Sequence, residues 1–325
     1  MKRIGFLMPK ILAWDNLLLA FCRAERGLSD KHEADTYRER LDENLRFLGE
    51  GLADGSFPFG EYHSFEVRDP KTRMIHAPAF RERVAQHAIF NVCEPYMERE
   101  LIDDCFACRK NKGTHGALKR VQTFARRYEW YLKLDVRRFF DSVVRSTLLE
   151  MLESVFKDRH LLGLFANVLA GYETTPGRGI PIGSLASQYF ANHYLSNLDR
   201  MIKQDLRVPG YLRYMDDFIL WSNDRKELRN ARDAVEERLE VLGLRLKRFT
   251  QPERVRGGVN FLGHRAHPFR MEADKRARTR FFRKIRSLQW LADEGMITEE
   301  ELQQRHQCLL GFASLSNLSA LQTGA

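Results

Sequence analysis

The sequence contains little cysteine and no long hydrophobic run. Five cysteines among 325 residues are an odd number, which argues against a disulfide framework and for a reducing environment. The longest apolar run near the start, Leu17 to Cys22, is too short to span a bilayer. Lys10 and Asp15 interrupt the same segment as a signal peptide. These features exclude secreted and integral-membrane proteins, and we expect a cytoplasmic location.

Repeats and several common catalytic motifs are also missing. No period of 20–50 residues recurs and no segment has low complexity, which excludes collagen-like, repeat and disordered chains. The HExxH, GxSxG and Walker patterns are absent, so a protease, esterase or NTPase has no support. Cys105 and Cys108 form a single CxxC motif with only His115 nearby, which is weak support for a zinc site.

The composition is that of a globular protein with a basic surface. Hydrophobic residues make up 43% and charged residues 30%. The net charge is +9 and the pI is about 9.4. An excess of cations suits a polyanionic partner such as nucleic acid.

Hydrophobic periodicity predicts helices together with a mostly antiparallel sheet, an α+β fold. Residues 1–56 are predicted to be helical, and residues 62–75 to form a hairpin with a turn at Asp69-Pro70. The remaining predictions are helices over 80–100, 115–128, 145–170, 184–205 and 224–242, strands over 130–135, 211–222 and 259–264, and a basic helical tail from residue 274.

Three aspartates carry the predicted chemistry. Asp216 and Asp217 lie between two apolar strands, so we expect them at an exposed turn. Adjacent carboxylates repel each other, and a bound cation such as Mg²⁺ relieves that repulsion. Asp135 ends another apolar strand and offers a third ligand. If the strands are neighbours, the carboxylates could hold two ions about 4 Å apart for phosphoryl transfer. The alternative is that an Asp-Asp pair is ordinary turn chemistry.

The tetrapeptide Tyr-Met-Asp-Asp between apolar strands resembles the catalytic hairpin of reverse transcriptases. Further blocks similar to that family occur in the family's order over roughly residues 60–270. These blocks are Arg73–Pro78 with Arg83–His87, Leu134–Ser142, Gly179–Gln188 continuing to Asn192, Leu242–Leu244 and Asn260–Gly263.

The resemblance implies an RNA-directed DNA polymerase built as a right hand. Residues 1–59 would be an N-terminal helical extension, 60–272 the fingers and palm, and 273–325 a basic helical thumb. The expected partners are template RNA, a primer or cDNA, and dNTPs. Two Mg²⁺ ions are the expected cofactors, with Mn²⁺ as a substitute. The thumb region leaves about 50 residues, too few for an RNase H domain.

Details of the blocks resemble the reverse transcriptases of diversity-generating retroelements, bacterial and phage elements of a group II intron-like lineage. Ile182 stands where most relatives carry Gln, and Ser187-Gln188 stands where they carry Ser-Pro. The Lys112–His115 segment is also similar to that group. The implied function is cDNA synthesis with errors opposite template adenines, alongside a small basic accessory protein. The alternative is a bacterial defence-associated enzyme that acts with a structured non-coding RNA against phage.

The family's motifs assign roles at the metals and the nucleotide. Asp135, Asp216 and Asp217 would hold the metal ions, and the carbonyl of Val136 would add a backbone ligand. Phe140 would exclude a 2′-hydroxyl, which favours deoxynucleotides.

Arg73, with Lys71 or Arg68 nearby, would clamp the triphosphate of the nucleotide. Each assignment has a structural alternative, namely a core aromatic ring for Phe140 and a solvated hairpin rim for Arg73.

Four further positions belong to the expected nucleotide site: Ile182, Gly183, Gln188 and Lys247. An aliphatic Ile182 offers no hydrogen bond to the nucleotide or template, and discrimination by shape alone is worth only about 1–3 kcal/mol. We therefore expect Ile182 to contribute to low fidelity, although an ordinary apolar contact explains it equally well. Lys247 would assist departure of pyrophosphate, or is simply solvated.

Two segments are expected to contact nucleic acid. Phe261, Leu262 and Gly263 resemble the primer grip, although core packing also explains Phe261. The helix from residue 274 to 290 carries seven basic residues against one acid, so its binding to template and primer should fall with salt. Its expected contact residues include Lys275, Arg276, Arg280, Arg283 and Lys284.

Two other functional classes remain open from the sequence. An RNA-directed RNA polymerase shares the two-metal palm, but Phe140 and the Tyr-Met before the aspartates argue against it. An RNA-binding scaffold with a decayed site would have lost at least one of the three aspartates, and all three are present.

Overall fold

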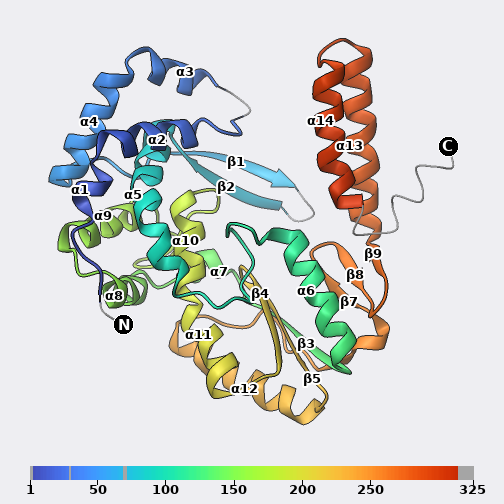
Figure 1. The fold of residues 1–325 in the computed structure, drawn as a ribbon. Helices are drawn as coiled ribbons and strands as arrows, with labels where there is room; N and C mark the ends of the chain where they lie inside the picture. Colours follow the sequence, from blue (N-terminus) through green and yellow to red (C-terminus); the bar gives the residue numbers. More distant parts are fainter. Residues whose placement is uncertain (1–2, 29–30, 69–71, 314–325) are drawn as a thin grey trace. The chain divides into compact units, whose positions relative to one another are not determined.

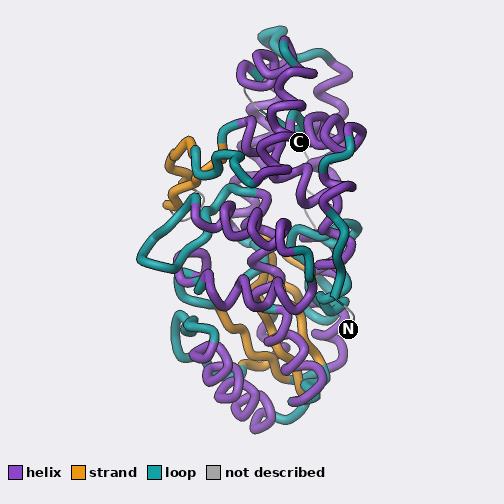
Figure 2. Tube along the Cα trace, turned by 90° about the vertical axis from the view of Figure 1, so that its left-hand side faces the viewer, coloured by secondary structure: helices purple, strands orange, loops and turns teal. Residues whose placement is uncertain are grey.

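A computed structural model describes residues 3–28, 31–68 and 72–313 (Figure 1). The chain forms two compact units, each built from three separate segments. Unit 1 comprises Met1–Asp103, Val136–Met201 and Val235–Arg248, and unit 2 comprises Asp104–Asp135, Ile202–Ala234 and Phe249–Ala325. Helices and strands are mixed throughout, so the predicted α+β class is confirmed (Figure 2). The division at residues 59 and 272 stays a prediction.

Unit 1 is mainly helical, with one β-hairpin. The hairpin pairs β1 with β2 in antiparallel register, from Tyr62 opposite Pro78 to Arg68 opposite Thr72. The predicted Asp69-Pro70 turn lies outside the described residues. The elements of unit 1 are α1 (Met8–Ile11), α2 (Trp14–Ala24), α3 (His32–Glu39), α4 (Leu41–Asp54), β1 (Tyr62–Arg68), β2 (Thr72–Pro78), α5 (Phe80–Glu98), α7 (Phe139–Ser142), α8 (Arg145–Val155), α9 (Arg159–Ala170), α10 (Leu185–Tyr194) and α11 (Ser196–Arg200).

Helix α5 is the central helix of unit 1, since it packs against both α2 and α10. Its apolar side chains Val84, Ile89 and Phe90 are buried. Phe90 stacks on Tyr189 of α10, with ring centroids 4.7 Å apart. Burial of large apolar side chains on several faces of one helix supplies most of the free energy that holds such a helical unit together.

Unit 2 contains two antiparallel sheets. The four-stranded sheet has the order β4-β5-β3-β6, and the three-stranded sheet the order β7-β8-β9. Helix α12 (Arg225–Val241) passes from unit 2 into unit 1. The other elements of unit 2 are α6 (Gly113–Arg127), β3 (Trp130–Asp135), β4 (Gly210–Tyr214), β5 (Asp217–Ser222), β6 (Glu253–Arg254), β7 (Val259–Phe261), β8 (His264–Ala266), β9 (Met271–Ala273), α13 (Lys275–Asp293) and α14 (Glu299–Ala313).

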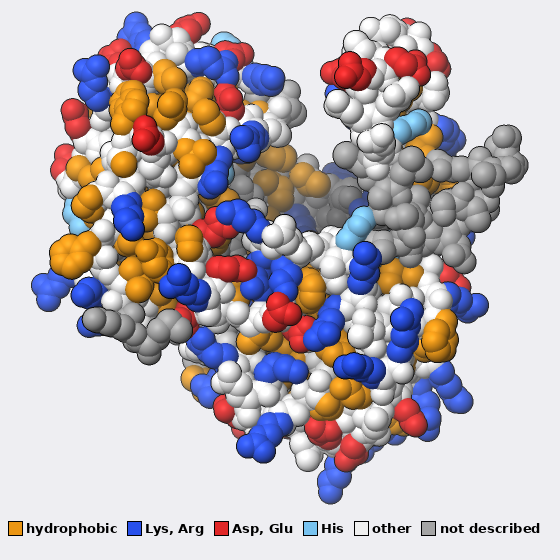
Figure 3. Space-filling model, viewed as in Figure 1, with side chains coloured by type: hydrophobic (Ala, Val, Ile, Leu, Met, Phe, Trp, Pro, Cys, Tyr) orange, Lys and Arg blue, Asp and Glu red, His pale blue; other side chains and the backbone are white. Residues whose placement is uncertain are grey.

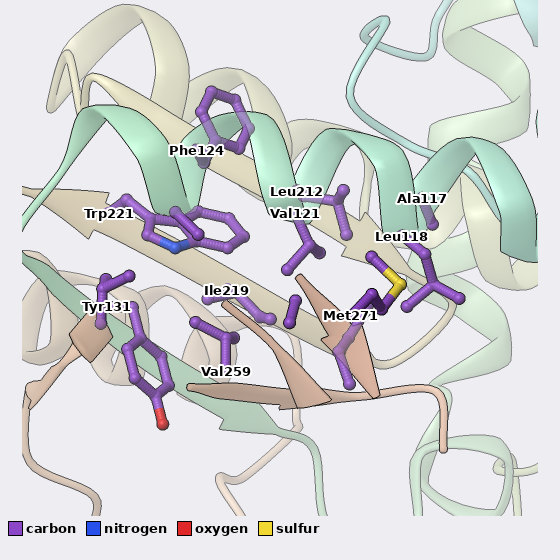
Figure 4. Packing of buried hydrophobic residues seen from close by; sticks show 14 of the residues in the cluster. Ala117, Leu118, Val121, Phe124, Tyr131, Leu212, Ile219, Trp221, Val259 and Met271 are labelled. Atoms are coloured by element: carbon purple, nitrogen blue, oxygen red, sulfur yellow. The ribbon is translucent and has the colours of Figure 1, made fainter. Parts of the chain in front are cut away.

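The core of unit 2 lies where α6 and both sheets meet (Figure 4). Leu118, Val121 and Phe124 of α6 pack against strand residues that include Trp221. The Phe124 and Trp221 rings have centroids 4.9 Å apart. This packing fixes the faces of β3, β4 and β5, because a slip of one residue would turn every buried side chain outward.

Three predicted elements are wrong in detail. The single helix over 145–170 is two helices, because Asp158 begins α9 by accepting a hydrogen bond from the Leu161 amide at 3.4 Å. The helix over 184–205 divides into α10, α11 and a π-helical turn over Met201–Asp205. The strand over 259–264 is a hairpin of β7 and β8. The other predicted helices and strands within the described residues are confirmed to within a few residues.

Within the described ranges, no helix is both long enough and apolar enough to cross a membrane.

Candidate active site

The three predicted catalytic aspartates lie at one end of the four-stranded sheet of unit 2. Asp135 is the last residue of β3, and its Cα pairs directly with that of Asp217, the first residue of β5. Directly opposed residues of an antiparallel pair project to the same face, with Cβ atoms about 5 Å apart. Asp216 precedes Asp217 in the turn that joins β4 to β5. Strand register therefore brings together Asp135 and Asp217, which are 82 positions apart in the sequence.

The turn between β4 and β5 has an unusual backbone. Tyr214 pairs with Asp217, which leaves only Met215 and Asp216 in the turn, and Met215 has φ of 59°. A positive φ in a residue with a side chain costs about 1–3 kcal/mol. The surrounding structure must hold the turn in this conformation.

Arg213 supplies part of that support. Its side chain is completely buried in β4, and one of its guanidinium nitrogens donates a hydrogen bond of 3.0 Å to the Met215 carbonyl. Its backbone amide donates to the Asp104 carbonyl and its carbonyl accepts from the Phe106 amide, both at 2.9 Å. A buried arginine is rare unless its donors are satisfied. We therefore treat Arg213 as a positioning residue of the aspartate turn.

Cys105 of the CxxC motif lies beside Arg213. Cys105 is buried and forms an isolated parallel bridge with Arg213, whereas Cys108 is exposed. Next to this segment, the hydroxyl groups of Thr114 and Tyr214 lie 3.2 Å apart, within hydrogen-bond distance. Cys105 therefore has a structural role beside the aspartates.

The donor set fits a divalent cation. The carboxylates of Asp135, Asp216 and Asp217 are half-exposed hard oxygen donors, the type that Mg²⁺ prefers. The Lys133 ammonium lies 3.8 Å from an oxygen of Asp217 and partly balances the charge. No group of three His, Cys, Asp or Glu side chains in the part of the chain that the structure describes is already arranged around a metal position. The backbone thus brings the three carboxylates to one end of the sheet.

The predicted primer-grip residues form the β7–β8 turn in unit 2. Leu262 and Gly263 make a two-residue loop in which both have positive φ, 48° and 76°, and positive φ at both positions is characteristic of a type I′ hairpin. Phe261 is buried in the core of unit 2, as the structural alternative expected. The Gly263 carbonyl accepts a 2.9 Å hydrogen bond from the Asp274 amide, so this turn is tied to the start of α13.

The basic tail begins as one helix, α13, which Asp274 caps by accepting a 2.7 Å hydrogen bond from the Ala277 amide. Ala277, Phe281 and Leu288 are buried along one face. All seven basic residues are exposed, among them the predicted contacts Lys275, Arg276, Arg280, Arg283 and Lys284. Lys and Arg also outnumber Asp and Glu over the face of the molecule seen in Figure 3. An exposed cationic face of this kind suits the sugar-phosphate backbone of a nucleic acid.

The predicted nucleotide residues of unit 1 lie on three segments joined by backbone hydrogen bonds. The His76 amide of β2 donates to the Ile182 carbonyl at 2.7 Å, and the Ile180 amide donates to the Phe140 carbonyl at 2.9 Å. Phe140 is half-buried, whereas Phe139 is buried. Arg73 is exposed on β2, three residues before His76. The loop at residue 182 is therefore connected to both β2 and α7.

Gly183 is a position in this loop that only glycine fits. Its φ is 113°, and a Cβ atom would lie 2.7 Å from Cγ2 of Ile75 and 3.2 Å from the His76 carbonyl oxygen. The loop can approach β2 this closely because it has no side chain there. Gln188 follows on α10 and is half-exposed, and Lys71 lies outside the described residues.

A buried polar chain fixes the start of α10. Glu82 accepts hydrogen bonds from the amides of Gly60 (2.8 Å) and Glu61 (3.1 Å), and from the Gln86 side chain at 3.1 Å. The Gln86 side-chain oxygen accepts in turn from the Ser184 hydroxyl at 2.9 Å and the Ala186 amide at 3.1 Å. We call Glu82, Gln86 and Ser184 the polar chain. Burial raises the pKa of Glu82, although the hydrogen bonds that it accepts oppose this.

Val136 and Lys247 lie on two paired segments of unit 1. Val136 forms an isolated antiparallel bridge with Leu246, and the Arg137 amide donates to the Arg245 carbonyl at 2.8 Å. Lys247 is exposed and directly follows this bridge.

The sequence interpretation missed Arg213 and the polar chain. In the sequence Arg213 is a single polar residue within an apolar strand, and this pattern does not indicate that its side chain is completely buried. Glu82 and Gln86 are four residues apart on α5, so they lie on the same side of the helix, close to buried Ala85 and Ile89. Polar residues at this spacing are also common on exposed helix faces, so the sequence alone did not indicate their burial.

Comparison with known proteins agrees with this geometry. The family model for reverse transcriptase (RNA-dependent DNA polymerase) matches residues 67–265. The group II intron-encoded protein LtrA of Lactococcus lactis subsp. cremoris is 25% identical over 209 residues, 61% of this chain and 34% of LtrA. Protein YkfC of Escherichia coli K12 is 24% identical over 273 residues, 70% of this chain and 72% of YkfC.

Solved telomerase structures from Candida tropicalis share the fold. The complex with a TWJ fragment of telomeric RNA matches 82% of this chain and 54% of that chain, with a TM-score of 0.52 and 13% identity. The apo form matches 73% of this chain and 53% of that chain, with a TM-score of 0.51 and 12% identity.

The fold is that of a right-hand polymerase, shared with the family model and the solved telomerase structures. Because the family match covers more than half of the sequence, the chain belongs to the reverse transcriptase family, the RNA-dependent DNA polymerases. It spans about a third of the length of LtrA.

Proposed function

We propose that this protein synthesises cDNA on an RNA template. The primer 3′-oxygen would attack the α-phosphorus of a dNTP, and pyrophosphate would leave. The observation that supports this most strongly is the direct pairing of Asp135 with Asp217 beside Asp216. Strand register, rather than a mobile loop, sets this juxtaposition.

Asp135, Asp216 and Asp217, with the Val136 carbonyl, would hold two Mg²⁺ ions, or Mn²⁺ as a substitute. When bound, such ions favour ionisation of the primer hydroxyl and neutralise charge on the phosphates. Arg73 would bind phosphate oxygens through its planar guanidinium. The half-buried Phe140 ring would contact the sugar and exclude a 2′-hydroxyl. Gly183 and Gln188 would line the nucleotide site.

Primer extension tests this proposal. Reactions would supply RNA or DNA template, dNTPs or NTPs, and Mg²⁺. We expect extension with dNTPs on RNA, and a loss of at least about 1000-fold, ~4 kcal/mol in barrier, in Asp216→Asn. Asp205→Asn, an exposed carboxylate of the same unit, is the matched control and should extend normally. Extension with NTPs alone, or full activity in Asp216→Asn, would overturn the proposal.

The exposed basic face of α13 would follow the phosphates of the template–primer duplex. Its affinity for an RNA–DNA hybrid should then fall steeply between low and moderate salt, because phosphate contacts release counterions. Affinity that barely changes with salt would remove α13 from the binding surface.

We further propose error-prone synthesis within a diversity-generating retroelement, with a small basic accessory protein or a structured RNA as partner. The supporting residues are Ile182 and the Ser187-Gln188 pair. Misincorporation by Ile182→Gln would be measured opposite all four template bases, with Ile182→Val as the control. Fewer errors opposite adenine are expected for the Gln variant only. Equal error rates in all three proteins would exclude Ile182 from the cause.

A further inference from the structure

A cavity in unit 1 is lined mostly by arginine. Its volume is about 380 Å³ and its lining residues are Arg137, Arg138, Ser142, Arg178, Gly243 and Arg245. None of these six residues is acidic. We call this cavity the arginine pocket. None of its residues belongs to the nucleotide site assigned above.

The backbone around the arginine pocket has two residues with positive φ, Arg138 and Gly243. Arg138 has φ of 45°, an uncommon conformation for a residue with a side chain. Gly243 has φ of 69°, and a Cβ atom there would lie 3.0 Å from a nitrogen of the Arg178 guanidinium. That guanidinium donates hydrogen bonds to the carbonyls of Ser142 at 3.1 Å and Gly243 at 3.0 Å. Arg178 thus joins two walls of the pocket and has a structural role.

The other three arginines are exposed at the pocket. Among the described residues, no carboxylate lies within ion-pair distance of Arg137, Arg138 or Arg245. Elsewhere in unit 1, by contrast, Arg81 pairs with Glu61 at 2.6 Å and Arg200 with Glu100 at 2.8 Å. Like charges that converge without a counterion repel each other, and an anion in the pocket would remove that repulsion.

The residues select the class of anion. Guanidinium groups bind phosphate oxygens through two parallel hydrogen bonds, and several guanidiniums around one cavity suit an ion with several phosphate oxygens. A pocket of about 380 Å³ has room for a small ion of one or two phosphate groups, and it is too small for an extended stretch of nucleic-acid backbone. Arg137 and Arg138 follow Asp135 by two and three residues, so their Cα atoms are within about 7 and 11 Å of its Cα by chain length alone.

We propose that the arginine pocket binds inorganic pyrophosphate. This rests on the proposed function, because pyrophosphate is the second product of each nucleotide addition. The primer 3′-hydroxyl loses its proton to solvent as its oxygen forms a bond to the α-phosphorus, and the bond from that phosphorus to the bridging oxygen breaks. Pyrophosphate leaves with the electron pair of the broken bond, and the pocket receives it. The residues of the pocket thereby control how strongly the product inhibits the enzyme.

Calorimetric titration of the full chain with sodium pyrophosphate tests the pocket without polymerisation. We expect the double variant Arg138→Gln/Arg245→Gln to bind at least tenfold more weakly than the unaltered protein. Arg46→Gln, an exposed arginine of α4 in the same unit, should bind normally. Inorganic phosphate should bind more weakly than pyrophosphate. Arg178 is left unchanged because it holds two backbone carbonyls, and thermal melting of each variant checks folding.

Three results would overturn the proposal. The first is that the unaltered protein does not bind pyrophosphate, and the second is that the folded double variant binds it normally. The third comes from steady-state kinetics. If the pocket holds the nucleotide's triphosphate instead, the double variant will raise KM for dNTPs without changing inhibition by pyrophosphate. If the protein binds pyrophosphate but does not extend primers, the assignment of the pocket holds and the proposed polymerase function is wrong.

Discussion

Two regions of this protein position candidate catalytic groups by different means. In unit 2 the aspartates are placed by strand register, and a buried arginine holds the strained turn between β4 and β5. In unit 1 the predicted nucleotide loop is placed by backbone hydrogen bonds to β2 and α7 and by the polar chain. A sheet tolerates little displacement at its strand ends, whereas a loop depends on each hydrogen bond that holds it. We therefore expect a substitution that disturbs the aspartate turn in unit 2 to lower stability and activity together. In unit 1 we expect each lost hydrogen bond to lower them by a smaller step.

The largest effect is expected from Arg213→Met in unit 2. The substitution removes the buried guanidinium that donates to the Met215 carbonyl, and losing a buried hydrogen bond from a charged group costs up to about 3 kcal/mol, in addition to the released strain of the turn. Urea unfolding and primer extension should both show the loss. Arg229→Met, an exposed position on α12, should leave both unchanged. Wild-type stability in Arg213→Met would mean that the turn holds its conformation without this side chain.

Gln86→Leu breaks the polar chain in unit 1. The Ser184 hydroxyl, the Ala186 amide and an oxygen of Glu82 would each lose a buried partner, for a combined loss of about 2–3 kcal/mol. We expect lower stability together with a higher KM for dNTPs, since the loop that begins α10 loosens. Ser184→Ala removes one donor and should have a smaller effect. A KM that does not change would separate the polar chain from the nucleotide loop.

A pair of glycine substitutions sharpens the comparison within unit 1. Gly183→Ala and Gly177→Ala both place a side chain at positive φ, 113° and 72°. The new methyl group clashes with Ile75 only at Gly183, since nothing lies within 4 Å at Gly177. Gly183→Ala should therefore be about 1–2 kcal/mol more destabilising. Equal melting temperatures would show that the loop moves away from β2 at no cost.

The smallest expected effect is the pH dependence of stability that His87 of unit 1 causes. Burial, with the nearby charges of Arg83 and Arg23, lowers the pKa of His87 to about 4. Between pH 6.5 and 4 the unfolded chain binds a proton that the folded chain does not, so stability falls as the pH falls through this window. We expect a loss of roughly 1 kcal/mol at His87 between pH 7 and pH 5.

The measurement is urea unfolding at both pH values, and His87→Gln should reduce the pH slope. The pKa of buried His193 is also lowered by burial, so only the difference between the two proteins reports on His87. Equal slopes would contradict the assignment.

The sequence predicted the elements that carry strong periodicity or alternation. The strand ending at Asp135 and the apolar strands around Asp216 were clear because alternation and a polar tip occur together. The break at Asp158 was missed because apolar spacing continues across it, although an aspartate before an apolar run is a capping signal. The burial of Arg213 and the convergence of four arginines arise from tertiary packing, which local patterns do not encode.

The central claim is that Asp135, Asp216 and Asp217 jointly bind divalent ions. The most direct test is Mn²⁺ binding, followed by electron paramagnetic resonance, to the full chain with a dideoxy-terminated primer, an RNA template and a dNTP. We predict at least tenfold weaker binding in Asp135→Asn and in Asp217→Asn, and unchanged binding in Asp205→Asn. Wild-type Mn²⁺ affinity in Asp135→Asn would contradict the account.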